Sequence, residues 1–499
     1  MNLGIGTWPQ RRAKVRPDDV AIEFEGREYS YAEVSERVTK LANALAAAGV
    51  KPGDRVGHLG FNHPALLELF FAAGLMGATS VLLNPRLKLA ELDYIVGDST
   101  PKVLAYGSEQ AESCAEMAET HPDMQFLSVD GDDLGTPYED FLQSGSTDPV
   151  DIELDLESPC LIMYTSGTTG RPKGAVLSHR ALFYQYVNAL IGQDLRQDEV
   201  YLATAPLFHI AGLNMLTIPT FTLGGRIIIH RGFKADAVLD EIERSKVTSS
   251  FFVPAMLDML SHHERFEATD LSSLRAVMVG GSPLMEPTLR TWLDRDVAIM
   301  QGFGMTETAP GVTMLESRDG LYKTGSAGRQ HFFTDAKIVD VLGDELPAGE
   351  AGEVIVTGPN LMTGYWNKPE ETDRAVEDGW YHTGDIAVRD EDGYLWIKDR
   401  IKDMYISGGE NVYPAEVENA LVSIPGIRDA AVIGVPDERW GETGKAFVVL
   451  KDESLTPESI AVALKPLLAN YKQPKYIQII DELPRNSTGK IQKQLLRDL

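Results

Sequence analysis

The first half of the chain alternates helical and extended patterns. Apolar side chains recur at helical spacing in residues 33–50 and in the strongly apolar stretch 63–77, and residues 54–60 between them read as a strand. The same alternation returns at 174–260 and at 274–300. Strands that alternate with helices form parallel sheets covered by helices on both faces. The pattern therefore predicts an α/β fold with parallel sheets for the large N-terminal part of the chain.

The pattern changes near residue 335. Short strands separated by Gly and Asp-Gly turns extend to residue 399 and predict a small β-barrel-like subdomain. Helices and strands then alternate on a smaller scale, which predicts a small α+β domain at the C-terminal end. We therefore expect an N-terminal domain at 1–399 with its β-rich part at about 335–399, a hinge at 400–402, and a C-terminal domain at 403–499.

Composition and charge restrict the partners. The 499 residues suffice for two or more domains, and 46 basic against 74 acidic side chains give a net charge of −28, which argues against nucleic acid. An anionic ligand would need local positive potential from backbone amides, a few Lys or Arg side chains, or Mg²⁺. Cys114 and Cys160 are expected to be reduced thiols of a cytoplasmic protein. The most hydrophobic stretch, 202–225, is interrupted by prolines and polar residues, so we expect no transmembrane segment.

The candidate phosphate-binding loop is the run from Tyr164 to Gly174, Tyr-Thr-Ser-Gly-Thr-Thr-Gly-Arg-Pro-Lys-Gly. It follows an apolar strand, and its glycines and hydroxyl side chains let backbone amides approach phosphate oxygens, with Lys173 as a point charge. The spacing differs from that of a Walker A loop, because Gly174 follows the lysine where that loop has Ser or Thr. A loop rich in Ser, Thr and Gly is most often just a loop, but the complete run is far more specific.

The complete run resembles the signature of the acyl-adenylate-forming superfamily, which includes acyl-CoA synthetases, aryl-CoA ligases, luciferases and adenylation domains. Further stretches match this superfamily, so that the resemblance extends over residues 10–499. These stretches are 206–209, 302–307, 381–385, 399–403 with 407–411, and 484–491. The resemblance implies an enzyme that uses ATP and Mg²⁺ to convert a small-molecule carboxylic acid into an acyl-adenylate and then transfers the acyl group to coenzyme A.

The resemblance also implies roles for the matching residues. Lys490 serves the adenylation step, Glu307 holds Mg²⁺, and Thr306 contacts phosphate. The residues implied to bind ATP or CoA are Thr165, Ser166, Gly167, Thr168, Thr169, Lys173, Gly281, Ser282, Gln301, Gly302, Phe303, Asp385, Arg400, Lys402, Gly408 and Gly409. The residues implied to form the acyl pocket, within or beside the run 308–312, are His209, Ala211, Gly212, Met215, Gly280, Gly304, Ala309 and Pro310, with His209 as a binding residue first and a catalytic residue second.

The chemistry of these residue types agrees with the implied roles. Phe303 between two glycines can lie flat on an adenine ring, and Thr306 and Glu307 offer oxygen ligands to Mg²⁺. Asp385 can accept hydrogen bonds from two ribose hydroxyls. Each motif alone also fits a purely structural role, as a turn, a core histidine or a solvated lysine. Their order and number along one chain favour function.

The implied reaction has two steps that need different arrangements of the chain. Lys490 would first assist the attack of a carboxylate on the α-phosphate of ATP. A mobile C-terminal domain would then turn about Lys402, so that Gly408 and Gly409 allow the pantetheine arm of CoA to pass close to the backbone.

The identity of the acid is less well specified. The pocket residues are apolar and small, without a cation to pair a second carboxylate, which disfavours malonate-like diacids. Several stretches look closest to actinobacterial feruloyl-CoA synthetases and their fatty acyl-CoA synthetase relatives. We expect a hydroxycinnamate-type aryl acid, with a medium- or long-chain fatty acid as the alternative. More remote alternatives are an adenylation domain that loads a carrier protein and a non-catalytic nucleotide-binding relative, and a homodimer is compatible with all of them.

Overall fold

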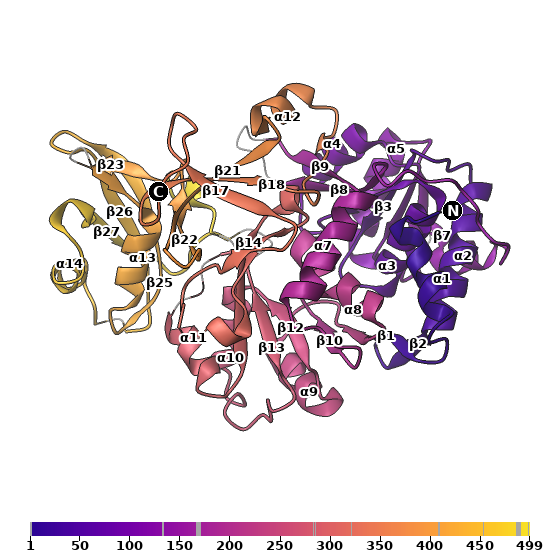
Figure 1. Ribbon diagram of the computed structural model, residues 1–499, viewed down its shortest axis with the longest axis horizontal. Helices are drawn as coiled ribbons and strands as arrows, with labels where there is room; N and C mark the ends of the chain where they lie inside the picture. The colour runs from indigo at the N-terminus through magenta and orange to yellow at the C-terminus, as the bar shows by residue number, and fades with distance from the viewer. Residues whose placement is uncertain are drawn as a thin grey trace. The chain divides into compact units, whose positions relative to one another are not determined.

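The computed structural model describes residues 2–131, 134–165, 171–282, 284, 286–320, 322–407, 410–452, 454–485, 491–497 and 499. Within it the chain forms two compact units, both visible in Figure 1. The first unit comprises Met1–Thr324, Gln330–Asp335 and Thr357–Tyr381, and the second comprises Gly325–Arg329, Ala336–Val356 and His382–Leu499.

The first sheet of the first unit contains the strand predicted at 54–60. Its eight strands run in the order β19 (Gly364–Tyr365), β9 (Lys173–Ser178), β8 (Pro159–Thr165), β4 (Thr79–Leu83), β3 (Arg55–Leu59), β5 (Val103–Tyr106), β6 (Gln125–Ser128) and β7 (Thr136–Pro137). The strands from β8 to β7 are parallel. The pairs β8–β9 and β9–β19 are antiparallel. The sheet is therefore parallel at its centre and antiparallel at the edge that carries the candidate phosphate loop.

The second sheet of the first unit follows the same plan. Its strands run in the order β16 (Arg329–Gln330), β15 (Gly311–Met314), β14 (Ala298–Gly304), β13 (Ala276–Val279), β12 (Ser249–Phe252), β10 (Val200–Ala203), β11 (Arg226–Ile229), β1 (Val20–Phe24) and β2 (Arg27–Ser30). The strands from β14 to β1 are parallel, and β14 pairs β15 in antiparallel fashion. These two sheets confirm the predicted α/β class with parallel strands.

Helices pack against both sheets. α3 (Pro64–Met76), predicted at 63–77, is buried along its whole length and packs on β3, β4 and β8. It begins with proline at its first position and ends at Gly77, whose φ of 72° suits glycine. α7 (His179–Gly192) contacts β9 of the first sheet and β15 of the second. The other helices of this unit are α1 (Trp8–Ala13), α2 (Tyr31–Ala47), α4 (Leu89–Ser99), α5 (Ala111–Thr120), α6 (Tyr138–Gln143), α8 (Ile218–Leu223), α9 (Ala235–Ser245), α10 (Pro254–Ser261), α11 (Glu286–Leu293) and α12 (Pro369–Ala375).

The second unit contains the smaller α+β pattern and, apart from Thr357–Tyr381, nearly all of the predicted β-rich segment. In the β-rich segment, β18 (Ala351–Thr357) lies between β17 (Asp335–Val339) and β21 (Trp380–Arg389), and β22 (Leu395–Arg400) pairs β21. The α+β part has a sheet of β24 (Glu410–Val412), β23 (Tyr405–Ser407), β26 (Gly441–Leu450) and β25 (Ile427–Asp437), with β27 (Tyr476–Ile479) beside β26. Its helices are α13 (Pro414–Val422), α14 (Pro457–Leu464) and α15 (Lys493–Leu496). A smaller α+β part at the C-terminal end is thus confirmed.

Two further expectations concern cysteines and membranes. Cys114 and Cys160 are free and buried, as predicted. Among the described residues, every helix is too short or too polar for a membrane crossing.

Candidate active site

In each sheet of the first unit, a candidate motif lies where the pairing changes from parallel to antiparallel. Thr165 at the end of β8 pairs with Lys173 at the start of β9, so the two ends of the candidate phosphate loop lie side by side. Ser166, Gly167, Thr168 and Thr169 lie outside the described residues. In the second sheet, β14 ends at Gly304 and the short helix η4 (Thr306–Thr308) precedes β15. Both hairpins start at the carboxyl end of a parallel strand, where ligands of open α/β sheets bind.

Lys173 has a charged partner that the sequence motifs did not indicate. Its ammonium forms an ion pair with Glu371 on α12 and lies 5.0 Å from the centre of the Tyr365 ring. The hydrogen bond from Lys173 lowers the pKa of the Glu371 carboxyl. The two side chains are 15% and 24% exposed, so water screens the pair incompletely. A phosphate group that binds Lys173 must therefore compete with Glu371.

Tyr365 also contacts the candidate metal ligand. Its hydroxyl donates a 2.9 Å hydrogen bond to Oε1 of Glu307, whose side chain is buried. Burial and the nearby Glu307 charge raise the pKa of Tyr365, so the hydroxyl keeps its proton and remains a donor. The pairing of β19 with β9, which sets Tyr365 opposite Ala175, fixes this position. One tyrosine thus links the lysine of the loop to the glutamate of the second motif.

Glu307 fits the role of a magnesium ligand that acts together with phosphate oxygens of the substrate. Mg²⁺ is commonly held by one or two carboxylates together with substrate phosphates, and a hydrogen bond to one carboxylate oxygen orients such a ligand. Within the residues that the structure describes, three or more His, Cys, Asp or Glu side chains nowhere form a candidate metal cluster. By the usual composition of Mg²⁺ sites, Glu307 would share the ion with substrate phosphate oxygens. Thr306, which precedes Glu307 on the same turn, is half-buried.

Most of the predicted acyl-pocket residues meet in one cleft. The cleft is lined by Ala211, Met215, Phe251, Val279, Gly280, Gly281, Gly302, Phe303, Gly304, Pro310, Gly311 and Thr313. Backbone approaches closely here, because a side chain on Gly304 would come within 1.5 Å of the Pro310 carbonyl oxygen. The space within the cleft is ≈ 40 Å³, enough for a few water molecules, whereas ligand pockets typically measure about 300–1,000 Å³. A bound acid must therefore displace a lining side chain.

Phe251, Val279 and Thr313 are lining residues that sequence reasoning missed. They are placed by strand pairing, since Thr313 lies opposite Phe303 and Val279 lies opposite Gln301. The apolar strand ending in the predicted glycine pair 280–281 could have indicated Val279. For Phe251 and Thr313 the sequence offers no comparable signal.

Three predicted pocket residues, His209, Gly212 and Ala309, are not part of this lining. Gly212 begins the π-helix η3 (Gly212–Thr217) and packs on Pro206, where a side chain would come within 2.1 Å of the carbonyl oxygen. Ala309 is fully buried with a φ of 68°. His209 lies just before η3, and burial lowers its pKa to about 4. Its buried Nε2 has no hydrogen-bond partner among the described residues, so an uncharged imidazole here can still take up a ligand.

The residues predicted beside the nucleotide lie on adjacent strands. Gln301 on β14 is buried and pairs with the end of β13. Gly280 and Gly281 follow β13, and Gly281 has a φ of 89°, a conformation that favours glycine. Ser282 next to them is exposed. The structure thus brings these residues to the same strand ends as Phe303.

The second unit carries the remaining predicted residues. Asp385 on β21 lies opposite Arg400 on β22, and Arg400 Nε is 3.0 Å from Oδ1 of Asp385. Lys402 is exposed in a tight turn, in which the backbone amides of Asp403 and Met404 donate to the Arg400 carbonyl oxygen. Gly408, Gly409 and Lys490 lie outside the described residues.

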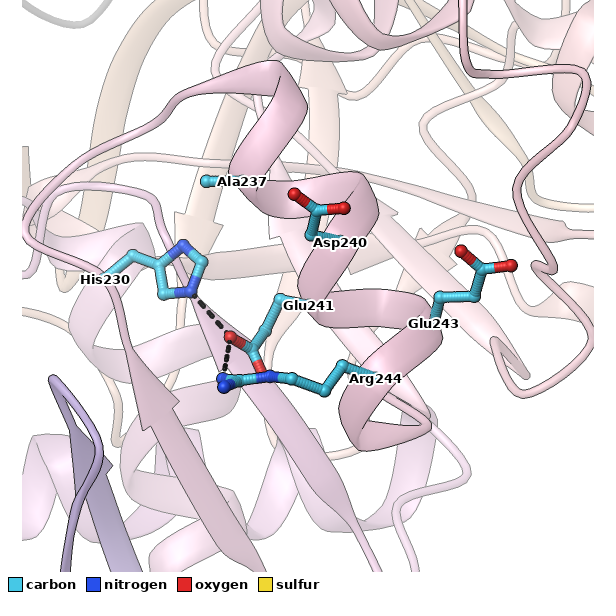
Figure 2. A pocket seen from close by; sticks show the side chains of 6 residues that line it. All are labelled: His230, Ala237, Asp240, Glu241, Glu243 and Arg244. Atoms are coloured by element: carbon cyan, nitrogen blue, oxygen red, sulfur yellow. Dashed lines mark hydrogen bonds and ion pairs between the residues drawn. The ribbon is translucent and has the colours of Figure 1, made fainter.

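A larger surface hollow of ≈ 680 Å³ lies on the first unit and is lined by residues of α9 together with His230 (Figure 2). Glu241 accepts from His230 Nε2 at 3.2 Å and from Arg244 at 2.5 Å, while Asp240 pairs with Arg265 outside the hollow. Burial raises the pKa of Glu241, but the hydrogen bonds from His230, Ser245 and Arg244 outweigh it and lower the pKa to about 2. The carboxylate is therefore already satisfied, and we assign no ligand to this hollow.

The first unit has a parallel α/β fold with a glycine-rich loop that ends in lysine, a buried glutamate and an apolar cleft. This combination is typical of a nucleotide-binding enzyme. A family model described as AMP-binding enzyme matches residues 9–366, and one described as AMP-binding enzyme C-terminal domain matches residues 416–490. The chain belongs to this family of AMP-binding enzymes.

Known relatives extend over essentially the whole chain. A feruloyl-CoA synthase of Amycolatopsis sp is 47% identical over 497 residues, covering 99% of each chain. A long-chain-fatty-acid–CoA ligase of Mycobacterium tuberculosis is 37% identical over 506 residues, covering 99% of this chain and 98% of the relative. The solved structure of o-succinylbenzoate coenzyme A synthetase from Bacillus subtilis, in complex with ATP and magnesium ion, has a TM-score of 0.88 at 30% identity and covers 99% of each chain.

Proposed function

We propose that this chain is an ATP-dependent carboxylate–CoA ligase. It converts a carboxylic acid into an acyl-adenylate with release of pyrophosphate, and then into an acyl-CoA thioester with release of AMP. The observation that carries the proposal is the position of Tyr365, which contacts both Lys173 and Glu307. Glu307 lies on the hairpin whose residues Gly304 and Pro310 line the apolar cleft. Tyr365 therefore joins the lysine implied to handle the phosphates to the hairpin that carries the implied metal ligand and lines the acyl cleft.

The first step joins two anions, so its barrier is largely electrostatic. A carboxylate oxygen attacks the α-phosphorus, and the bond between that phosphorus and the bridging oxygen of pyrophosphate breaks. Lys173 would pair with phosphate oxygens, and Glu307 would hold Mg²⁺, which neutralises charge that develops on the phosphates. Each such group contributes on the order of 3–4 kcal/mol to transition-state stabilisation. Lys490, by its resemblance to the adenylation lysine, would add a further positive charge.

The second step needs access for a thiol. The sulfur of CoA attacks the acyl carbon, the bond from that carbon to the phosphate oxygen of AMP breaks, and the thiol proton passes to solvent. The family motifs support a hinge at 400–402 with Lys402 as the pivot, after which Gly408 and Gly409 would border the pantetheine arm. Arg400 and Asp385, joined to each other in the second unit, would contact the ribose end of the nucleotide.

The acid that we propose is an aryl acid of the hydroxycinnamate type. The feruloyl-CoA synthase relative supports this class, and the aromatic and glycine-rich lining of the cleft suits a flat ring. A medium- or long-chain fatty acid is the second candidate, which the Mycobacterium tuberculosis relative supports.

The test is pyrophosphate release from ATP and Mg²⁺ with ferulate, coumarate, benzoate, octanoate and palmitate, followed by AMP and thioester formation with CoA. Turnover with a holo-carrier protein in place of CoA would instead favour the carrier-loading alternative. We also propose a cytoplasmic enzyme, and a homodimer stays a prediction that light scattering would check.

A further inference from the structure

A buried polar pair lies directly behind the wall of the acyl cleft. Gln185 on α7 is fully buried, and His331, which follows β16, is 4% exposed. Both side chains lie against Gly311, a residue of the cleft wall that carries no side chain. A Cβ at Gly311 would lie 2.5 Å from Oε1 of Gln185 and 2.8 Å from Nε2 of His331. Any other residue at position 311 would push its side chain into Gln185 and His331, so glycine allows both polar groups to lie against this part of the cleft wall.

One atom of this pair is unsatisfied. Nε2 of His331 has no hydrogen-bond partner among the described residues, although it is buried. An unpaired buried polar atom costs about 1–3 kcal/mol, so such an atom beside a cleft indicates a missing partner. Burial lowers the pKa of His331 to about 4, which leaves the ring uncharged near neutral pH. An uncharged imidazole in such a buried place suits an uncharged hydrogen-bond partner.

The side-chain amide of Gln185 has one good hydrogen bond and one weak one. Its Oε1 accepts a 3.2 Å hydrogen bond from the Gly311 amide, while its Nε2 faces the thioether sulfur of Met215 at 4.0 Å. Sulfur is a weak acceptor, and methionine is a flexible side chain that repacks readily. Met215 also lines the cleft, whose space is too small for an aromatic acid. If Met215 moves to admit a ring, Nε2 of Gln185 loses its contact with the sulfur and can donate to the bound ligand instead.

We propose that His331 and Gln185 form the ring-recognition end of the acyl cleft, where Nε2 of His331 hydrogen-bonds a phenolic hydroxyl of an aromatic acid. This inference rests on the proposed function and narrows it. A phenol is uncharged near neutral pH and both donates and accepts, so it matches a neutral imidazole in either tautomer. A fatty acid offers no such group at its far end. His331 and Gln185 are specificity-determining residues in this account, remote from the reacting carboxylate.

The test compares two acids that differ in one hydroxyl, 4-hydroxycinnamate and cinnamate, in CoA-dependent AMP formation by the full chain. We expect kcat/KM of the wild type to favour 4-hydroxycinnamate by about tenfold or more, because a site built for a hydroxyl discriminates against its absence. His331→Leu should reduce the ratio to about twofold or less, chiefly through loss with 4-hydroxycinnamate. His331→Gln, which can place an amide nitrogen near the position of Nε2, should retain much of the preference.

A matched control is His58→Leu, since His58 on β3 is also buried with an unpaired ring nitrogen, Nδ1, among the described residues, but it does not line the cleft. This variant should leave the ratio unchanged. A wild type that uses both acids equally, or a His331→Leu variant with the wild-type ratio, would overturn the inference while leaving the ligase proposal intact. Failure of every acid to release pyrophosphate would instead remove the proposed function itself. If His331→Leu does not fold, His331→Gln carries the assignment, and a wild type that uses both acids equally would still overturn the inference.

Discussion

The hydroxyl of Tyr365 lies 2.9 Å from Oε1 of Glu307, a residue 58 positions earlier in the chain. The same tyrosine ring lies beside the Lys173 ammonium. Tyr365 therefore holds in place the carboxylate that we assign to Mg²⁺ and contacts the lysine that we assign to phosphate. The pairing of β19 with β9 places Tyr365 beside the strand that carries Lys173, while Glu307 lies on η4 between β14 and β15.

Tyr365→Phe should weaken the use of Mg²⁺ while keeping the ring beside Lys173. Loss of a hydrogen bond to a metal ligand typically costs about 10- to 100-fold in metal affinity or activity. We expect the Mg²⁺ concentration for half-maximal pyrophosphate release to rise about tenfold. Tyr476→Phe, at a 45% exposed tyrosine of the second unit, is the control. An unchanged Mg²⁺ titration for Tyr365→Phe would show that the hydroxyl does not orient a metal ligand.

Glu371→Gln should strengthen ATP binding. The Glu371 carboxylate forms an ion pair with the ammonium of Lys173, which ATP must break. Incompletely buried ion pairs contribute about 0.5–1 kcal/mol, which corresponds to roughly a two- to fivefold change in ATP affinity. We expect the KM for ATP to fall by that factor, with a smaller change in kcat. Glu370→Gln, next in sequence and highly exposed, should leave the KM unchanged. A higher KM for ATP in Glu371→Gln would mean that Glu371 positions Lys173 for the phosphates.

Lys490→Ala should separate the two half-reactions. The proposed role is confined to adenylate formation, so pyrophosphate release should fall by about two to three orders of magnitude. Thioester formation from a supplied acyl-adenylate and CoA should continue near the wild-type rate. Lys493→Ala is unsuitable as a control, because Lys493 pairs with Glu418 at 2.8 Å. Lys465→Ala, at an exposed lysine of the second unit, serves as the control. Equal loss of both half-reactions in Lys490→Ala would refute the assignment.

Arg37 is a stability residue of the first unit. Its guanidinium lies 2.5 Å from Glu68 and 2.5 Å from Glu139, and the Arg37 and Glu68 side chains are 8% and 1% exposed. Arg37→Leu leaves the Glu68 charge buried, so the free energy of unfolding should fall by about 3–5 kcal/mol. Arg27→Leu breaks an exposed pair with Glu33 and should cost less than about 1 kcal/mol. Denaturant unfolding that gives equal losses for the two variants would contradict this account.

The elements of the fold were largely predictable because the hydrophobic pattern is local. The helix at 63–77 and the strand at 54–60 were read from apolar runs bounded by glycine and proline, and α3 and β3 confirm them. The α/β class followed from the order of such elements. The grouping of chain segments into units depends on contacts between distant residues, which a local pattern does not contain.

Those residues of the candidate site that belong to recognisable sequence motifs could be predicted. Lys173, Glu307 and the glycines around Phe303 were singled out from their motifs. Tyr365 and Glu371 were not, because their importance comes from tertiary contacts made through β19 and α12. His331 stands between a polar and an aromatic neighbour in the sequence, and its burial and its unpaired nitrogen become visible only in the folded chain.

The most direct test of the central claim is a stoichiometric assay of the purified chain with ATP, Mg²⁺, ferulate and CoA. The account predicts pyrophosphate, AMP and feruloyl-CoA in equal amounts, with pyrophosphate released in the absence of CoA and no product when ATP or the acid is omitted. Absence of pyrophosphate with ferulate and with every other acid of the panel would contradict it.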